Sequence, residues 1–197
     1  MKIEAKLVKE LRLKTGAGMM DCKNALLKSN GNLNDAIDHL RKSGITKAEK
    51  KGARQTKEGI VYSYIHAGSR LGVLLEINCE TDFVAKTDGF SELAHNVAMQ
   101  IAATNPISLD ISSIDQSLVA REKEIFKEQA KSDGKPKHII EKMIEGRLQK
   151  FYQDSCLLEQ TYIKDPEKKI KDLITETIAT LGENISINRF IRFAIGE

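Results

Sequence analysis

Cys79, His66 and His95 are the side chains of this chain whose types could support nucleophilic catalysis. A cysteine next to a histidine can act as a thiolate, but the site also needs an orienting group and oxyanion donors. Neither is found at a recognisable spacing, and a free cysteine after an apolar run is typical of a buried hydrophobic residue. The four histidines are not spaced with cysteines as zinc ligands are. The sequence therefore predicts no catalytic residue and no metal.

A nucleotide site is not indicated either. Gly16-Ala17-Gly18 precedes a predicted helix, which superficially resembles a phosphate-binding loop. However, no strand precedes these glycines, and the pattern Gly-x-x-x-x-Gly-Lys-Ser/Thr is missing. We therefore expect no cofactor. Met19 and Met20 follow the glycines, and paired methionines at a helix start are either core residues or, when exposed, a flexible docking surface.

The segment Thr81-Asp82-Phe83-Val84 is the strongest candidate for a binding site. It follows a short apolar, β-branched run at residues 71–77, which predicts a buried strand. Binding residues are often found at a loop held by a rigid strand. A second interpretation is that Phe83 packs into its own core while Asp82 begins an ordinary turn. Spacing alone does not separate these two interpretations.

Three amphipathic helices are predicted in the first 45 residues. Leu7, Val8 and Leu11 mark the apolar face of the first helix, which ends at the glycines of residues 16–18. The second helix covers about residues 19–29. Asn32 is the predicted N-cap of the third, and Gly44 is expected to end it.

The rest of the chain mixes strands and helices. Residues 59–67 and 71–77 predict an antiparallel hairpin, and the alternating tail from residue 185 predicts a strand that pairs with it. Helices are expected at residues 93–105, 118–129 and 139–158, with a turn at residues 133–136. Another helix is expected to start at Asp165-Pro166, because Asp can cap and Pro suits the first helical position. The fold class is α+β, a three-stranded sheet packed by helices.

The composition restricts the choice of partners. The net charge of +3 is too small to make nucleic acid the expected partner, and no apolar run could span a bilayer. Residues 47–57 carry a net charge of +4, so the remaining residues sum to −1. This segment is interpreted as a basic linker at residues 46–58, with an RNA-contacting arm as the alternative. Three widely separated cysteines fit a reducing compartment.

Three blocks of sequence resemble the elongation factor Ts family. They are Leu7–Arg12 with Thr15–Lys23, the segment Asn78–Ala85, and Gly182–Ile185 with Arg189 and Phe190. The blocks occur in family order and cover essentially the whole chain. The resemblance implies an N-terminal ubiquitin-associated-like bundle at residues 1–45 and an α+β core, of the dimerisation type, at residues 59–197.

The resemblance also implies a function. Members of the family exchange nucleotide on elongation factor Tu, which they meet in GDP-bound and nucleotide-free forms. By resemblance, Asp82 and Phe83, within the segment Thr81 to Val84, enter the partner's nucleotide domain and disturb the groups that hold Mg²⁺ and the β-phosphate. Arg12, Met19 and Met20 match residues that dock a helix of the same domain. The chain would then act without catalytic chemistry of its own.

The chain departs from the long members of this family. Those members carry a second core lobe and an inserted coiled-coil hairpin, whereas only about 80 residues separate Ala103 from Gly182 here. The chain therefore resembles the short form, which dimerises in some members, so a homodimer is one expected assembly. The expected location is the bacterial cytoplasm or an organelle stroma, the plastid included.

Overall fold

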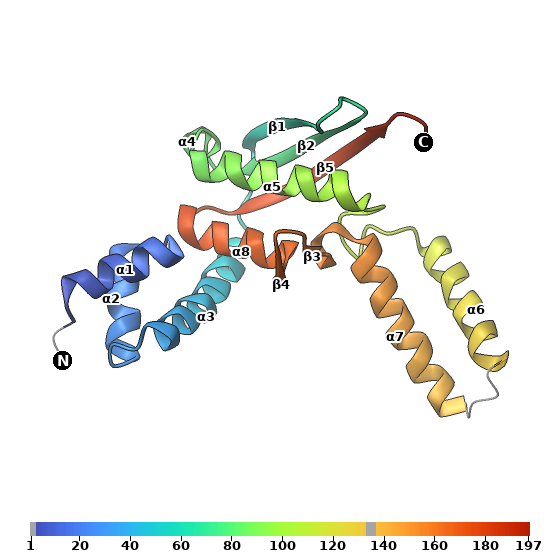
Figure 1. Cartoon of the computed structure of the whole chain (residues 1–197), viewed down its shortest axis with the longest axis horizontal. Coiled ribbons are helices and arrows are strands. Elements are labelled where there is room, and N and C mark those ends of the chain that lie inside the picture. The colour runs from blue at the N-terminus through green and yellow to red at the C-terminus, as the bar shows by residue number, and fades with distance from the viewer. Residues whose placement is uncertain (1–2, 133–136) are drawn as a thin grey trace. The chain divides into compact units, whose positions relative to one another are not determined.

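The structure, a computed structural model, describes residues 3–132 and 137–197 (Figure 1). By compactness the chain divides into two units, each built from separate stretches of sequence. The first unit comprises residues 1–61, 76–94 and 172–188, and the second unit comprises residues 62–75, 95–171 and 189–197. The helices and strands mix within both units, which confirms the predicted α+β class.

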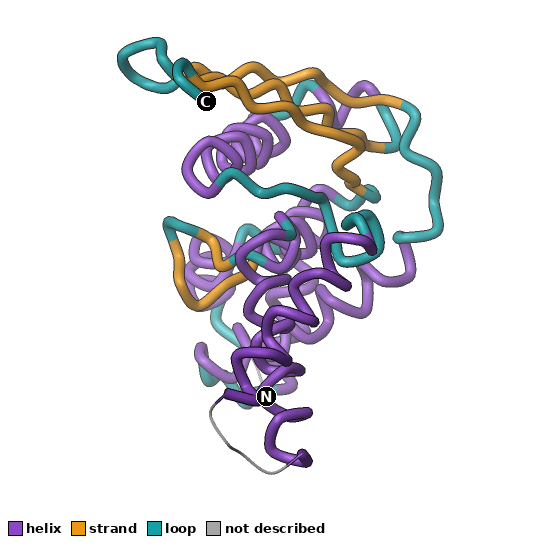
Figure 2. The backbone as a smooth tube through the Cα atoms, turned by 90° about the vertical axis from the view of Figure 1, so that its right-hand side faces the viewer, coloured by secondary structure: helices purple, strands orange, loops and turns teal. Residues whose placement is uncertain are grey.

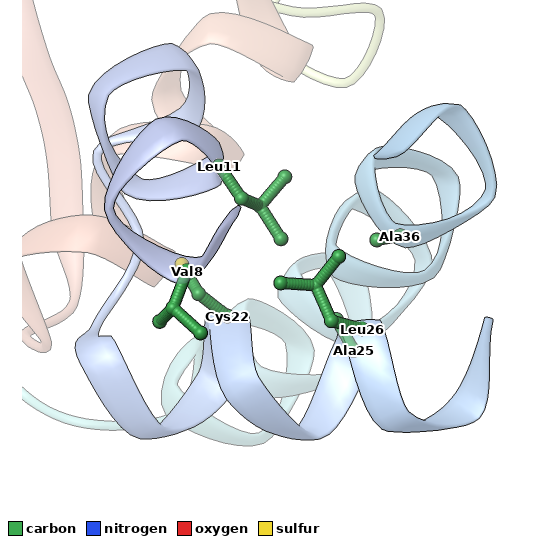
Figure 3. Packing of buried hydrophobic residues seen from close by; sticks show 6 residues of the cluster. All are labelled: Val8, Leu11, Cys22, Ala25, Leu26 and Ala36. Carbon is green, nitrogen blue, oxygen red and sulfur yellow. The ribbon is translucent and has the colours of Figure 1, made fainter. Parts of the chain in front are cut away.

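The first unit begins with the predicted three-helix bundle. Its helices are α1 (Ala5–Thr15), α2 (Met19–Lys28) and α3 (Leu33–Lys51). Asn32 caps α3 as expected, since its side chain accepts hydrogen bonds from the backbone of residues 34 and 35. The apolar faces meet in a small core in which Leu11 of α1, Leu26 of α2 and Ala36 of α3 point toward one another (Figure 3). That core holds the bundle together.

The prediction that Gly44 ends the third helix is wrong. Helix α3 continues through Gly44 to Lys51, across the expected domain boundary at residue 45 and into the expected linker. A Cβ added at Gly44 would lie 3.2 Å from the Cβ of Ala179 in α8 (Ile170–Leu181), within the same unit. The glycine therefore serves a close helix–helix approach and not a helix end. The division at residues 45 and 58 stays a prediction.

The predicted three-stranded antiparallel sheet is confirmed. Its order is β1 (Glu58–Ile65), β2 (Leu71–Cys79) and β5 (Ile185–Ala194), so the tail strand pairs with the second strand of the hairpin. Figure 2 shows the three strands side by side. The His66 amide donates to the Leu71 carbonyl at 2.9 Å and closes the hairpin.

One face of the sheet is covered by α5 (Asp88–Thr104), which follows the short helix α4 (Asp82–Ala85). In the second unit, Tyr62 of β1 contacts His95 of α5, and Arg192 of β5 donates to the Ala102 carbonyl. The side chains of β2 alternate accordingly: Val73 and Leu75 are buried, whereas Leu74 between them is 45% exposed. The opposite face of the sheet thus carries apolar side chains in contact with solvent.

The second unit also contains a pair of packed helices, α6 (Gln116–Ser132) and α7 (Lys137–Ser155), which run side by side in Figure 1. The Arg147 guanidinium of α7 lies 5.8 Å from the ring centre of Phe126 in α6 and also donates to Gln129. The helices were predicted, but their pairing was not. The turn expected at residues 133–136 lies outside the described residues.

The helix start predicted at Asp165-Pro166 is wrong. Residues Asp165–Lys169 form β4, which pairs with β3 (Thr161–Tyr162) after the 3₁₀ helix Leu157–Glu159, and α8 begins only at Ile170. Pro166 is tolerated because a two-stranded ribbon has free edges that need no N–H donor. The cap signal was overridden by this pairing and by the burial of Ile170.

Candidate functional site

The tip that follows β2 is built around helix α4, a single helical turn. Thr81 has an extended backbone and caps this turn, since its hydroxyl accepts from the Val84 amide at 3.4 Å. The Ala85 amide donates to the Thr81 carbonyl at 3.3 Å. Ala85, the last residue of the turn, is buried. Thr87 links the turn to α5, because its hydroxyl donates to the Val84 carbonyl at 2.8 Å and accepts from the Phe90 amide of α5 at 3.3 Å. The tip is therefore a defined turn and not a loose loop.

Phe83 projects from this turn into solvent. Its side chain is 80% exposed, although large aromatic side chains are usually buried, whereas Phe90, seven residues later, is fully buried. The structure thus decides between the two interpretations left open by the sequence, because Phe83 is not part of the core. The ring of Phe83 is therefore available for burial against another molecule.

Asp82 lies on the same turn and forms an ion pair with Lys86. The Lys86 ammonium donates to Oδ2 of Asp82 at 2.6 Å across one helical turn. This hydrogen bond, together with the lysine charge, holds the pKa of the Asp82 carboxyl below its usual range. The carboxyl is therefore ionised at neutral pH. Lys86 is a neighbour of the candidate site that the sequence reasoning did not single out.

A network formed by the two residues that precede β5 holds the base of the tip. The Glu183 carboxylate accepts from the Glu80 amide at 3.2 Å, and from the amide and hydroxyl of Thr81 at 3.0 and 2.7 Å. Glu80 in turn accepts from the Asn184 amide at 2.7 Å and from the Arg54 guanidinium at 3.5 Å. All of these residues lie in the first unit. Glu183 and Asn184 are in the third family-like block, but the sequence alone gave them no role.

Cys79, at the end of β2, supports the same tip. It is fully buried, and its thiol donates to the Thr81 carbonyl at 3.1 Å. Burial raises the pKa of the Cys79 thiol, and the nearby Glu183 carboxylate raises it further. A thiol that stays protonated at neutral pH is a poor nucleophile. Cys22 and Cys156 are likewise free and buried.

The histidines considered beside Cys79 have partners of their own. Nδ1 of His95 lies 3.1 Å from the Tyr62 hydroxyl, and Nδ1 of His66 lies 2.9 Å from the Tyr64 hydroxyl. Among residues 3–132 and 137–197, no cluster of three or more His, Cys, Asp or Glu side chains is arranged to bind a metal ion. In the same residues, every helix is too short or too polar to cross a membrane.

The other predicted site residues lie on the bundle. Arg12 is exposed in the last turn of α1, and Met19 and Met20 begin α2 with exposed fractions of 42% and 63%. Leu13, which the sequence reasoning did not select, is 88% exposed beside Arg12. Both methionines are therefore outside the bundle core, which leaves the docking-surface interpretation of the pair. These residues lie on α1 and α2, on elements separate from the tip at Thr81–Val84.

The basic segment at residues 47–57 is partly neutralised. The Lys47 ammonium donates to the Asp21 carboxylate at 2.8 Å, and Arg54 pairs with Glu80. Since an RNA-contacting arm gains its affinity from cations that are available to phosphates, these pairs weaken that alternative.

Comparison with known proteins gives a consistent result. A family model described as elongation factor TS matches residues 5–197. An elongation factor Ts from Syntrophomonas wolfei is 57% identical over 195 residues, covering 99% of this chain and 91% of that protein. One from Fervidobacterium nodosum is 54% identical with both chains covered completely. One from Thermodesulfovibrio yellowstonii is 55% identical, covering all of this chain and 98% of the relative.

Proposed function

Because this chain belongs to the elongation factor Ts family, we propose that it is a guanine-nucleotide exchange factor that binds elongation factor Tu and promotes GDP release. The observation that carries the site assignment is the 80% exposure of Phe83 on a turn whose base is hydrogen-bonded. The chain supplies binding and displacement, and no covalent chemistry of its own.

The proposed mechanism acts on the phosphate end of the partner's nucleotide. A GTPase of the P-loop type retains GDP largely through backbone amides around the phosphates and through Mg²⁺. Insertion of Phe83 would move the elements that carry these groups, and the ionised Asp82 would add negative charge near the phosphate. Since linkage is reciprocal, GDP then weakens the exchange factor by the same factor as the exchange factor weakens GDP.

A second contact is proposed on the bundle. Arg12, Met19 and Met20 would dock another helix of the partner's nucleotide domain, which leaves the tip to act on the nucleotide. Two exposed methionines form an adaptable apolar surface, and the exposed Arg12 guanidinium can add a directional hydrogen bond. The segment Thr81 to Val84 and this surface together make up the proposed partner-binding site.

We also propose that the chain forms a homodimer through the open face of its sheet. In the second unit this face carries five exposed apolar side chains, which are Ile65, Leu74, Ile191, Phe193 and Ile195. A face of this kind is self-complementary, so a two-fold axis can cover both copies at once, in the manner of a β-sandwich. The solution mass of the protein, alone and with its partner, tests this assembly.

The proposed location is wherever elongation factor Tu acts. The relatives described above come from bacteria, which favours the bacterial cytoplasm over an organelle stroma such as that of plastids. No direct contact with nucleic acid is proposed.

The central experiment measures release of fluorescent GDP from purified elongation factor Tu. The wild-type chain should accelerate release, and the double variant Asp82→Ala with Phe83→Ala should lose most of that acceleration while staying folded. Both side chains are exposed or half-exposed, so their removal should not unfold the protein. A double variant that exchanges nucleotide at the wild-type rate would contradict the proposed mechanism.

A further inference from the structure

Glu183 contacts the tip although it lies 102 positions after Thr81 in the sequence. Gly182 ends α8 with a left-handed backbone, φ +85°, and its amide donates to the Ile178 carbonyl at 3.0 Å. The packing of α8 against the start of α5 brings this turn beside the tip, since a Cβ on Gly89 would lie 3.4 Å from the Leu181 side chain. The next residue is Glu183, so its side chain lies directly after the end of α8 and beside the end of β2.

The carboxylate of Glu183 uses both oxygens on the base of the tip. One oxygen accepts from the amides of Glu80 and Thr81, and the other accepts from the Thr81 hydroxyl at 2.7 Å. That hydroxyl also accepts the Val84 amide and so caps α4. Hydrogen bonds to an ionised acceptor are about twice as strong as neutral ones. Three such bonds converge on the two residues that immediately precede Asp82.

The other contacts around Glu183 do not replace these bonds. Glu80 points its side chain to the Asn184 amide and to Arg54, and the side chain of Asn184 donates to the Arg54 carbonyl at 2.8 Å. These contacts hold the segment that precedes β1 and the start of β5. The amide and hydroxyl of Thr81 are held by Glu183.

We propose that Glu183 is a positioning residue for nucleotide exchange, which acts by fixing Thr81 so that Phe83 and Asp82 are presented in one orientation before the partner binds. The proposal rests on the exchange function proposed above. A preorganised tip loses little conformational entropy on insertion, whereas a loose tip must be ordered at the expense of binding energy. Since the bundle surface would still dock, loosening the tip should reduce the maximal release rate more than it changes the half-saturating concentration.

The experiment compares Glu183→Ala, Glu183→Gln and the matched control Glu49→Ala, which removes the same charge from an exposed position on α3. GDP release from elongation factor Tu is measured over a range of exchange-factor concentrations. Glu183→Ala should lower the maximal rate about tenfold, the loss expected when charge-assisted hydrogen bonds are removed. Glu183→Gln should keep most of the rate, because its amide oxygen can still accept from both backbone amides and its NH₂ group can donate to the Thr81 hydroxyl. Glu49→Ala should behave as wild type.

Two further measurements separate positioning from a general loss of structure. Hydrogen exchange in Glu183→Ala should accelerate at the amides of Glu80 and Thr81 and stay unchanged at Ile101 in the core of the second unit. Thr81→Val removes the hydroxyl that Glu183 holds, so the double variant Thr81→Val with Glu183→Ala should lose less than the product of the two single losses, because the shared contact is lost only once. If Glu183→Ala unfolds, Glu183→Asp tests the contact instead, because it keeps the charge but shortens the side chain by one methylene and leaves Thr81 and the cap of α4 unchanged. A lower maximal rate is then expected, and a wild-type rate in Glu183→Asp would overturn the positioning role.

The outcomes distinguish this inference from the proposed function. The positioning role would be overturned if Glu183→Ala released GDP at the wild-type maximal rate while hydrogen exchange was faster at the amides of Glu80 and Thr81. The proposed nucleotide-exchange function would then remain intact. Losses of Thr81→Val and Glu183→Ala that multiply would also overturn it, because the two groups would then act independently. A wild-type chain that does not accelerate GDP release overturns the proposed function and this inference together.

Discussion

Truncation of Phe83 to alanine should reduce nucleotide exchange without affecting the stability of the free protein. Full burial of a phenylalanine side chain stabilises by roughly 1.5–3 kcal/mol. In the free chain Phe83 is 80% exposed, so nearly all of that energy is still available to a partner. Phe83→Ala should therefore weaken the complex with elongation factor Tu by about 1–2.5 kcal/mol, which corresponds to about 5- to 60-fold.

The effect of Phe83→Ala on folding should be much smaller. Substitutions of exposed residues usually change the free energy of unfolding by less than about 0.5 kcal/mol. Phe90→Ala provides the matched contrast, since Phe90 has the same side chain but is fully buried. Its truncation should cost about 3–5 kcal/mol of stability. The two variants thus separate a binding role from a core role for the same residue type.

The assay is the concentration dependence of fluorescent-GDP release, measured together with thermal unfolding of each variant. A Phe83→Leu variant should be intermediate, because leucine keeps part of the apolar surface. The reasoning is refuted if Phe83→Ala exchanges nucleotide like wild type. It is also refuted if the loss of exchange in Phe83→Ala is matched by a loss of stability as large as that of Phe90→Ala.

Three further predictions concern other parts of the molecule. Lys86→Ala should raise the pKa of the Asp82 carboxyl toward its ordinary range, because the hydrogen bond that favours the ionised form is lost. Carbon NMR titration of the Asp82 side chain measures this pKa, and an unchanged pKa would contradict the ion pair. Phe193→Asp should place a charge on the open face of the sheet and yield a monomer by solution mass, whereas a dimer that persists would exclude this face as the interface. Gly59→Ala should lower the melting temperature markedly, because a Cβ at φ +149° would lie 2.2 Å from the Ile77 carbonyl oxygen. Thermal unfolding checks this, and a wild-type melting temperature would show that β1 and β2 can move apart there without a loss of stability.

Local signals in the sequence were sufficient for the strands of the sheet and for the helices of the bundle, apart from the end of α3. The helices of the bundle follow from apolar spacing and from Asn32 as a cap, and β5 follows from its alternating residues, although the alternation of burial is interrupted where Asn188 and Arg189 are both exposed. These features depend on residues within a few positions of one another. For the same reason, the sequence located the tip, since a buried strand followed by Asp82 and Phe83 is a local pattern.

The two predictions that were wrong concern local signals that a neighbouring element overrides. Gly44 carries a helix-ending signal, but α3 continues because α8 packs closely against it. Asp165 and Pro166 carry a helix-starting signal, but the residues pair with β3 instead. Long-range packing against α8 outweighed the local preference at Gly44, and a short-range strand pairing outweighed it at Asp165, each preference being worth about 1 kcal/mol.

Patterns in the amino-acid sequence were enough to identify the family, the fold class and the two candidate residues at the tip of β2. The exposure of Phe83 became clear from the folded chain, because it depends on which segments cover the turn. Only the tertiary structure joined Glu183 to Thr81, since a hydrogen bond between residues 102 positions apart has no periodic signal in the sequence. Side chains are assigned to strands and helices by local spacing, but their environment is set by the segments that fold against them.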